Sequence, residues 1–318
     1  MPMFHDIDYD FGISAIDSGY VRPRLGAIHL IVEGGRAAVV DTGVNNSVPR
    51  VLDVLRAKGI APDQVDYVIL THIHLDHAGG AGLLMSQLPN ARLTVHPRGA
   101  RHMIDPGKLV ASALAVYGAP VMDRMYGRIV PVARERVIET PHGSSIQLNG
   151  REFVFYDTPG HARHHVCAFD AKSGHLFAGD TFGLSYREFD YDGRQFTFPS
   201  SSPTQFDPDA AHRSLDLIVG LKPAAIYVTH YSQVREIARL ADDMHRLIDA
   251  HADLARAERG AGAERHARLL AGVIEIALNE ARRYGWRVGR EQVLDVLGMD
   301  LELNAQGLAI WLDAHKAA

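Results

Sequence analysis

Four side chains that can bind a metal ion occur within six residues of this chain, in the sequence Thr-His-Ile-His-Leu-Asp-His over residues 71–77. The motif directly follows an apolar run that is typical of a buried strand. Residues two apart point to the same side at a strand end, so we expect His72 and His74 to face one ion. Asp76 and His77 lie past the strand, where the chain turns toward a helix, and we expect them to point at a neighbouring position. Burying this cluster is costly unless a cation compensates it, so the spacing predicts a metal site.

Single aspartates and histidines follow other apolar runs of the chain in the same way. They are Asp41 after residues 37–40, His161 after 153–156, Asp180 after 176–178 and His230 after 225–228. Each one alone is weak evidence, because a polar residue at a strand end is often a cap or a loop residue. Together they indicate one functional site, because sheet proteins of the α/β class place their sites outside strand ends.

Short apolar runs that alternate with helical patterns favour an α/β fold. We expect helices over residues 47–58 and 209–221, and a helical insertion over 103–128. Residues 183–208 are rich in Gly, Pro, Ser and aromatic residues, which predicts a long loop of the kind that is usually functional. The predicted strands are 27–32, 37–40, 67–70, 92–95, 153–156, 166–169, 176–178 and 225–228.

The pattern of predicted secondary structure changes after His230, because only helical patterns follow. The predicted helices are 234–256, 263–284, 290–297 and 304–315. We therefore expect two domains, a catalytic domain over residues 1–232 and a helical subdomain over 233–318. The apolar faces of the later helices must pack on something. Two alternatives stay open: one helix covers the pocket, or the helices pack against the catalytic domain far from the metals or form the interface of a homodimer.

Composition narrows the classes of function. The 318 residues include 33 Lys and Arg against 38 Asp and Glu, a net charge of −5, which argues against a general nucleic-acid partner. No uncharged apolar run approaches the roughly 20 residues that span a bilayer, so no membrane association is expected. Residues 1–10 lack the apolar stretch of a secretory signal, and Cys167 is the single cysteine, so we expect a cytoplasmic protein. The 18 histidines are unusually many and agree with a metal site.

Taken in order, these motifs resemble the metallo-β-lactamase superfamily, in its glyoxalase II-like branch of binuclear hydrolases. The resemblance rests on Asp41, the motif over residues 71–77, Thr-Pro-Gly-His161, Gly-Asp180-Thr and His230, and it spans roughly residues 25–232. It implies an αββα sandwich, in which two sheets face each other between outer helices. The helical pattern after His230 is similar to the C-terminal helical parts found in this superfamily.

The resemblance also implies a ligand set for two divalent ions. One ion would be held by His72, His74 and His161, and the other by Asp76, His77 and His230. Asp180 would bridge the two ions, and Asp41 would orient the ligand loop without touching either. Imidazole and carboxylate ligands suit Zn²⁺, although Fe or Mn fits the same ligands.

Such a centre hydrolyses an ester-like bond by attack of a metal-bound hydroxide, with Asp76 and Asp180 in catalytic roles. We find no clear basic cluster that would clamp a glutathione carboxylate, so the expected substrate is a small ester, lactone or thioester. The alternatives are a phosphodiesterase, a mononuclear-iron persulfide dioxygenase and a non-catalytic, metal-stabilised regulatory protein. The candidates for substrate contact are Tyr186, Arg187, Phe198 and Tyr231.

Overall fold

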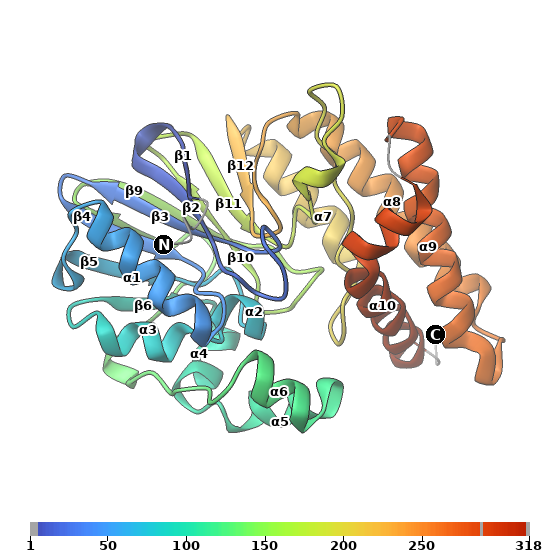
Figure 1. Cartoon of the computed structure of the whole chain (residues 1–318), viewed down its shortest axis with the longest axis horizontal. Helices are drawn as coiled ribbons and strands as arrows, with labels where there is room; N and C mark the ends of the chain where they lie inside the picture. The colour runs from blue at the N-terminus through green and yellow to red at the C-terminus, as the bar shows by residue number, and fades with distance from the viewer. Residues whose placement is uncertain (1–5, 287–288, 316–318) are drawn as a thin grey trace. The chain divides into compact units, whose positions relative to one another are not determined.

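The computed structural model describes residues 6–286 and 289–315, so residues 1–5 of the segment considered for a secretory signal lie outside it. The described residues fall into two compact units, whose helices and strands are drawn in Figure 1. The first unit takes in the described part of Met1–Asp157 together with His164–Gly179 and Ala224–Gln233. The second takes in Thr158–Arg163, Asp180–Pro223 and the described part of Val234–Ala318. None of the helices in these ranges is long and apolar enough to cross a membrane.

The first unit contains a mixed sheet of seven strands, in the order β1-β2-β3-β4-β5-β6-β7. Neighbouring strands are antiparallel from β1 to β4 and parallel from β4 to β7. The four strands predicted in this part of the chain are confirmed, whereas β1, β2 and β7 were not predicted. The strands are β1 (Asp6–Asp8), β2 (Ile13–Asp17), β3 (Ala27–Glu33), β4 (Arg36–Val40), β5 (Val65–Ile69), β6 (Arg92–Val95) and β7 (Val137–Glu139).

A second sheet has six strands in the order β13-β12-β11-β10-β9-β8. Strands β8 to β11 pair antiparallel, and β11 pairs parallel with β12. The four predicted strands of this region are confirmed as β9 to β12. The strands are β8 (Ser145–Leu148), β9 (Arg151–Asp157), β10 (Val166–Asp170), β11 (His175–Gly179), β12 (Ala225–Val228) and β13 (Ser232–Val234).

Apolar side chains cover both faces of the seven-stranded sheet. On one face, residues such as Ile31 and Val40 pack with Phe155 and Phe177 of the six-stranded sheet. On the other face lie α1 (Val48–Ala57), α3 (Ala81–Gln87) and α4 (Pro97–Ile104). The predicted sandwich of two sheets with flanking helices is confirmed. The predicted helical insertion is formed by the end of α4 with α5 (Gly107–Tyr117) and α6 (Ala119–Met125).

The parallel strands bring their carboxyl ends to one edge of each sheet. In the first sheet β4 leads to Asp41, and its parallel neighbour β5 leads to the loop that carries His72 and His74. In the second sheet β11 leads to Asp180, and its parallel neighbour β12 leads to His230. This placement follows the rule that open α/β sheets build their sites beyond the carboxyl ends of their strands.

Four helices form most of the second unit: α7 (Pro208–Gly220), α8 (Ile237–Ala257), α9 (Arg265–Tyr284) and α10 (Arg290–Ala314). Helix α8 contacts each of the other three, and α9 packs along α10 (Figure 1). A bidentate ion pair between Arg246 and Glu280, with N–O distances of 2.7 Å, joins α8 to α9. The predicted long loop contains a short bridge between Leu184 and Phe198, and Arg239 of α8 donates to the carbonyl oxygen of Gln195 within it.

The prediction of two separate helices over residues 290–297 and 304–315 is wrong, because α10 is continuous from Arg290 to Ala314. Leu297, Leu301, Asn304 and Leu308 are all buried, and their spacing of three or four residues keeps one stripe on a single helix face. Glycine in a helix costs only about 1 kcal/mol, so this continuous stripe outweighs the glycine that follows Leu297. The predicted division of the chain at residues 232 and 233 stays a prediction.

Candidate metal centre

The loop after β5 and a short helix carry the clustered motif. Strand β5 ends at Ile69, so His72 and His74 lie in the following loop. The sequence predicts them at the strand end itself, and the structure differs on this point. His74 precedes the short helix α2 (Leu75–Ala78), which contains Asp76 and His77. A helical turn replaces the simple turn expected here, because the backbone N–H groups of residues 77 and 78 both donate to the carbonyl oxygen of His74.

Asp41 is buried behind this loop and accepts hydrogen bonds from three directions. Its carboxylate receives the backbone N–H of Thr71 at 2.9 Å and the hydroxyl of Thr229 at 3.0 Å. It also receives Nδ1–H of His77 at 2.8 Å. The backbone of Asp41 is left-handed, with φ of 56°, a conformation that Asp and Asn tolerate better than most residues. Asp41 therefore fixes both the start of the ligand loop and the orientation of one imidazole.

Asp76, His77 and His230 form a complete group within the first unit. Their ligand atoms lie within 4.8 Å of one another. Nε2 of His77 and Nε2 of His230 are each 3.5 Å from Oδ2 of Asp76. Nδ1 of His230 donates to the carbonyl oxygen of Leu25 at 2.7 Å. A neutral imidazole that donates from Nδ1 keeps its lone pair on Nε2, so both histidines present a ligand atom to the same point.

His161 and Asp180 lie close together in the second unit. Nε2 of His161 is 3.5 Å from Oδ2 of Asp180, and its Nδ1 donates to the carbonyl oxygen of Ser200 at 3.0 Å. The loop before His161 is packed tightly, since a Cβ on Gly160 would lie 2.4 Å from Cα of Ala211 in α7. His161 thus has the same arrangement as His77 and His230, with an oxygen acceptor on Nδ1 and a carboxylate facing Nε2.

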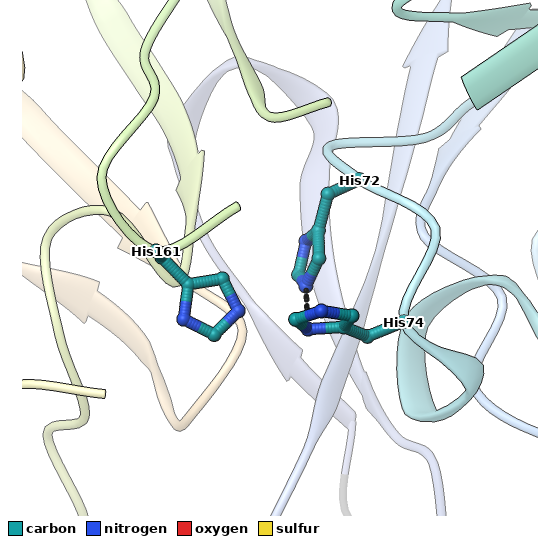
Figure 2. Close-up of side chains that lie close together, drawn as sticks. All are labelled: His72, His74 and His161. Carbon is teal, nitrogen blue, oxygen red and sulfur yellow. Dashed lines mark hydrogen bonds between the residues drawn. The ribbon is translucent and has the colours of Figure 1, made fainter. Parts of the chain in front are cut away.

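Two further groups have ligand atoms within the same 4.8 Å limit. One contains His72, His74 and His161, and the other contains His72, His77 and Asp180. Figure 2 shows the first of these, with Nε2 of His72 3.0 Å from Nδ1 of His74. All seven residues predicted as ligands therefore occur in these three groups.

The donor set fits divalent transition metals. Each group combines imidazole nitrogens with at most one carboxylate, which is the ligand chemistry that Zn²⁺, Fe and Mn accept. Most members are buried, whereas His74 and Asp76 are half-buried. A buried collection of this kind is stable when a cation balances its carboxylates.

Burial lowers the pKa of two other histidines of the first unit. Burial lowers the pKa of His29 to about 4, while the negative charge of Asp41 acts in the opposite direction. Burial also lowers the pKa of His96, against the effect of Asp157, whose carboxylate lies 3.3 Å from Nε2. His29 is therefore neutral at pH 7 and adds no positive charge behind Asp41.

The four candidates for substrate contact lie in different settings. Tyr186, Phe198 and Tyr231 are fully buried, and the hydroxyl of Tyr186 donates to Asp300 at 3.1 Å. The Arg187 guanidinium lies 3.2 Å from the carboxylate of Asp190. Their roles toward a substrate stay predictions.

Sequence reasoning assigned no role to several groups that orient the ligands. Thr71 and Thr229 donate to Asp41, and the carbonyl oxygens of Leu25 and Ser200 accept from His230 and His161, respectively. Thr71 and Thr229 directly precede His72 and His230, so their positions were a usable signal, whereas nothing local marks Leu25 or Ser200.

Comparison with known proteins identifies related chains. The family model described as "Metallo-beta-lactamase superfamily" matches residues 21–230. The metallo-beta-lactamase fold-containing protein ST1585 of Sulfurisphaera tokodaii is 27% identical over 224 residues, which are 69% of this chain and 78% of that protein. A hydroxyacylglutathione hydrolase of Stenotrophomonas maltophilia is 33% identical over 152 residues, which are 48% of this chain and 44% of that enzyme. The alignment thus spans less than half of the hydrolase.

Solved structures share the fold. The crystal structure of ST1585 superposes with a TM-score of 0.65 at 23% identity and covers 93% of this chain and 98% of its own. The metallo-beta-lactamase family protein TTHA1429 of Thermus thermophilus gives a TM-score of 0.64 at 19% identity and covers 96% and 94%. At these identities the structural matches establish the architecture alone.

Proposed function

Since this chain belongs to the metallo-β-lactamase superfamily and is a metal-dependent hydrolase, we propose that it cleaves a small ester, lactone or thioester at a centre of two divalent ions. His72, His74 and His161 would hold one ion, and Asp76, His77 and His230 the other, with Asp180 between them. Zn²⁺ is the ion that we propose. The hydroxyacylglutathione hydrolases among its relatives, whose name specifies an acyl-glutathione substrate, support an acyl substrate for this chain.

One observation carries the proposal: three histidines present Nε2 in the same way. Nδ1–H of His77, His161 and His230 donates to an oxygen of Asp41, Ser200 and Leu25, respectively. Each Nε2 then lies 3.5 Å from a carboxylate oxygen. A purely structural histidine gains nothing from a carboxylate facing its unprotonated nitrogen, whereas a cation placed between the two groups is attracted to both.

Two ions held in this way would polarise the scissile carbonyl and supply an activated water at neutral pH. Asp76 is the carboxylate of the group that stays half-buried, with 24% of its side chain exposed. We assign Asp76 to orient the attacking water and to accept its proton. Asp180 is almost fully buried, so its role is to hold the centre together.

The proposal is tested by metal analysis followed by a panel of substrates. Mass spectrometry on protein purified without chelator should find about two ions per chain. The reconstituted protein should hydrolyse lactones or thioesters faster than bis(p-nitrophenyl) phosphate. Asp180→Ala should lose an ion and activity, whereas Asp253→Ala, which removes an exposed carboxylate, should change neither. One ion at saturating Zn²⁺ and Mn²⁺, or a preference for the phosphodiester, would contradict the proposal.

Three further expectations stay predictions. They are the cytoplasmic location, the absence of a nucleic-acid partner and the homodimer as one use of the C-terminal helices. Gel filtration across a range of protein concentrations tests the homodimer directly.

A further inference from the structure

The orientation of His161 depends on a backbone carbonyl oxygen. Its Nδ1 donates to the oxygen of Ser200 at 3.0 Å, and Figure 2 shows its ring with the rings of His72 and His74. Ser200 belongs to the long loop after Asp180, in a stretch without helix or strand. A loop carbonyl can orient an imidazole only if the loop itself is held in place. Residues 199–201 must therefore be held by contacts from elsewhere in the chain.

A single side chain of α10 binds this segment on both sides of Ser200. Oδ1 of Asn304 accepts from the backbone N–H of Ser201 at 2.7 Å. Nδ2 of Asn304 donates to the carbonyl oxygen of Pro199 at 2.9 Å. Asn304 is 1% exposed, so water cannot replace either bond.

The pair of bonds requires an amide. A carboxylate cannot donate to the oxygen of Pro199, and an aliphatic side chain satisfies neither group. Burying polar groups without partners costs about 1–3 kcal/mol each, so the segment would move to recover its hydrogen bonds if the amide were removed. Any such movement shifts the carbonyl oxygen of Ser200, which lies between the two anchored residues.

The backbone of α10 also lies directly against the segment. A Cβ on Gly307, one turn after Asn304, would lie 1.7 Å from the carbonyl oxygen of Ser201. Glycine is therefore required for this close approach. The amide of Asn304 and the bare backbone at Gly307 together leave residues 199–201 little room for another position.

We propose that Asn304 is a positioning residue for the metal-binding function of His161. Asn304 fixes residues 199–201, the carbonyl oxygen of Ser200 fixes the Nδ1–H tautomer and the ring plane of His161, and Nε2 is thereby presented as a ligand. This inference rests on the proposed function, because it assigns a role toward an ion that His161 would bind. It makes the last helix of the chain part of the metal site.

The test compares two variants of α10 that differ in what they remove. Asn304→Leu keeps a similar volume and deletes both hydrogen bonds to residues 199–201. Leu308→Ala removes buried volume one turn later on the same helix, where the side chain is 0% exposed, and deletes no hydrogen bond. Thermal unfolding of the metal-free proteins measures how much stability each variant loses.

Two readouts follow the metal site itself. Zn²⁺ affinity is measured by competition with a chromophoric chelator, and the ligand field is followed by the visible absorption of the Co²⁺-substituted protein. Asn304→Leu should lower the affinity for one of the two ions by about 10–100-fold, as changes to groups that orient a ligand typically do. It should also alter the Co²⁺ spectrum. Leu308→Ala should keep the affinity and spectrum of the unmodified chain even where it loses as much stability.

The outcomes separate the inference from the function on which it rests. An unmodified chain that fails to bind two ions contradicts the proposed function itself. An unmodified chain that binds two ions, with Asn304→Leu matching it in affinity and spectrum, overturns the role of Asn304 alone. Equal weakening by Leu308→Ala would also overturn it, since the effect would then follow stability.

Should Asn304→Leu not fold, two other variants apply the same test. Asn304→Asp keeps the acceptor for Ser201 and loses the donor to Pro199. Gly307→Ala keeps the amide and displaces the carbonyl oxygen of Ser201. Both variants should lower the affinity for one ion and change the Co²⁺ spectrum. An unchanged affinity and spectrum in both variants would overturn the inference.

Discussion

Replacing Asp41 by Asn should reverse the tautomer of His77 and so weaken one metal site. Asn tolerates the left-handed backbone at residue 41 and keeps the shape of the side chain. Its Oδ1 can still accept from the backbone N–H of Thr71, but an NH₂ group then faces Nδ1 of His77, which lies 2.8 Å from Oδ2 in the unmodified chain. Two donors cannot share one hydrogen bond, so His77 moves its proton to Nε2, the nitrogen that faces Asp76 at 3.5 Å.

The expected loss of metal affinity follows from the hydrogen bond between residue 41 and Nδ1 of His77. Restoring the metal-binding tautomer of His77 against an Asn breaks the hydrogen bond from the Asn amide to Nδ1 and leaves two buried donors facing each other, at a cost of about 1–3 kcal/mol. At about 1.4 kcal/mol per factor of ten, the ion at Asp76, His77 and His230 should bind roughly 5- to 150-fold more weakly. Changes to groups that orient a ligand typically cost about 10–100-fold, in the same range.

Competition with a chromophoric chelator measures the affinity, and long-range ¹H–¹⁵N NMR of the metal-free protein identifies the protonated nitrogen of His77. Thr229→Val is the matched control, because it removes a hydrogen bond to the same oxygen of Asp41, 3.0 Å long, and leaves His77 its acceptor. The control should lose less than about tenfold in affinity. An Asp41→Asn protein whose His77 stays protonated at Nδ1, or whose affinity is within about twofold of the unmodified chain, would refute the reasoning.

Three further predictions concern stability and loop geometry. Burial lowers the pKa of His251 to about 4 from 6.5, so the stability that the neutral imidazole contributes is present above pH 6.5 and is lost as the pH falls toward 4. In urea titrations, His251→Phe should therefore reduce the fall in unfolding free energy between pH 6.5 and pH 4 by up to about 3 kcal/mol, and an unchanged pH dependence would count against this. Arg151→Leu leaves the fully buried Asp170 without its guanidinium partner and should lower the unfolding free energy by about 3–5 kcal/mol, whereas a loss below about 1 kcal/mol would show that the pair is dispensable. Gly160→Ala places a Cβ 2.4 Å from the backbone of α7 at φ of 135°, so it should lower both the melting temperature and the amount of bound metal. Gly220→Ala, whose Cβ meets nothing within 4 Å, should change neither, and equal behaviour of the two variants would contradict this.

Local patterns in the sequence were enough to predict most of the strands and to select the seven side chains that gather in the three candidate metal groups. Each strand predicted from a β-branched or apolar run occurs in one of the two sheets. The strands that were not predicted are short, like the three-residue β7, or lie outside the clearest apolar runs, and their pairing partners decide their conformation. The break predicted inside α10 failed because the stripe through Leu297, Leu301 and Leu308 continues across it.

The groups that orient the ligands could not be predicted in the same way, because they act across long separations in the chain. Thr229 reaches Asp41 over 188 residues, and the carbonyl oxygen of Leu25 meets His230 over 205. No local periodicity encodes such pairs, since they exist only after the sheets have formed. A backbone carbonyl carries even less signal, because every residue has one.

The three imidazoles that donate from Nδ1 are anchored by different parts of the chain, and this difference has a consequence for the family. The acceptors of His77 and His230 are Asp41 and Leu25, both inside residues 21–230, the part that the family model matches. The acceptor of His161 is a loop carbonyl whose position depends on Asn304, outside that part. A chain that keeps every ligand but exchanges its C-terminal helices can therefore keep the orientation of His77 and His230 while losing that of His161. Among relatives with different C-terminal regions, the affinity for the ion that we propose for His161 should vary first.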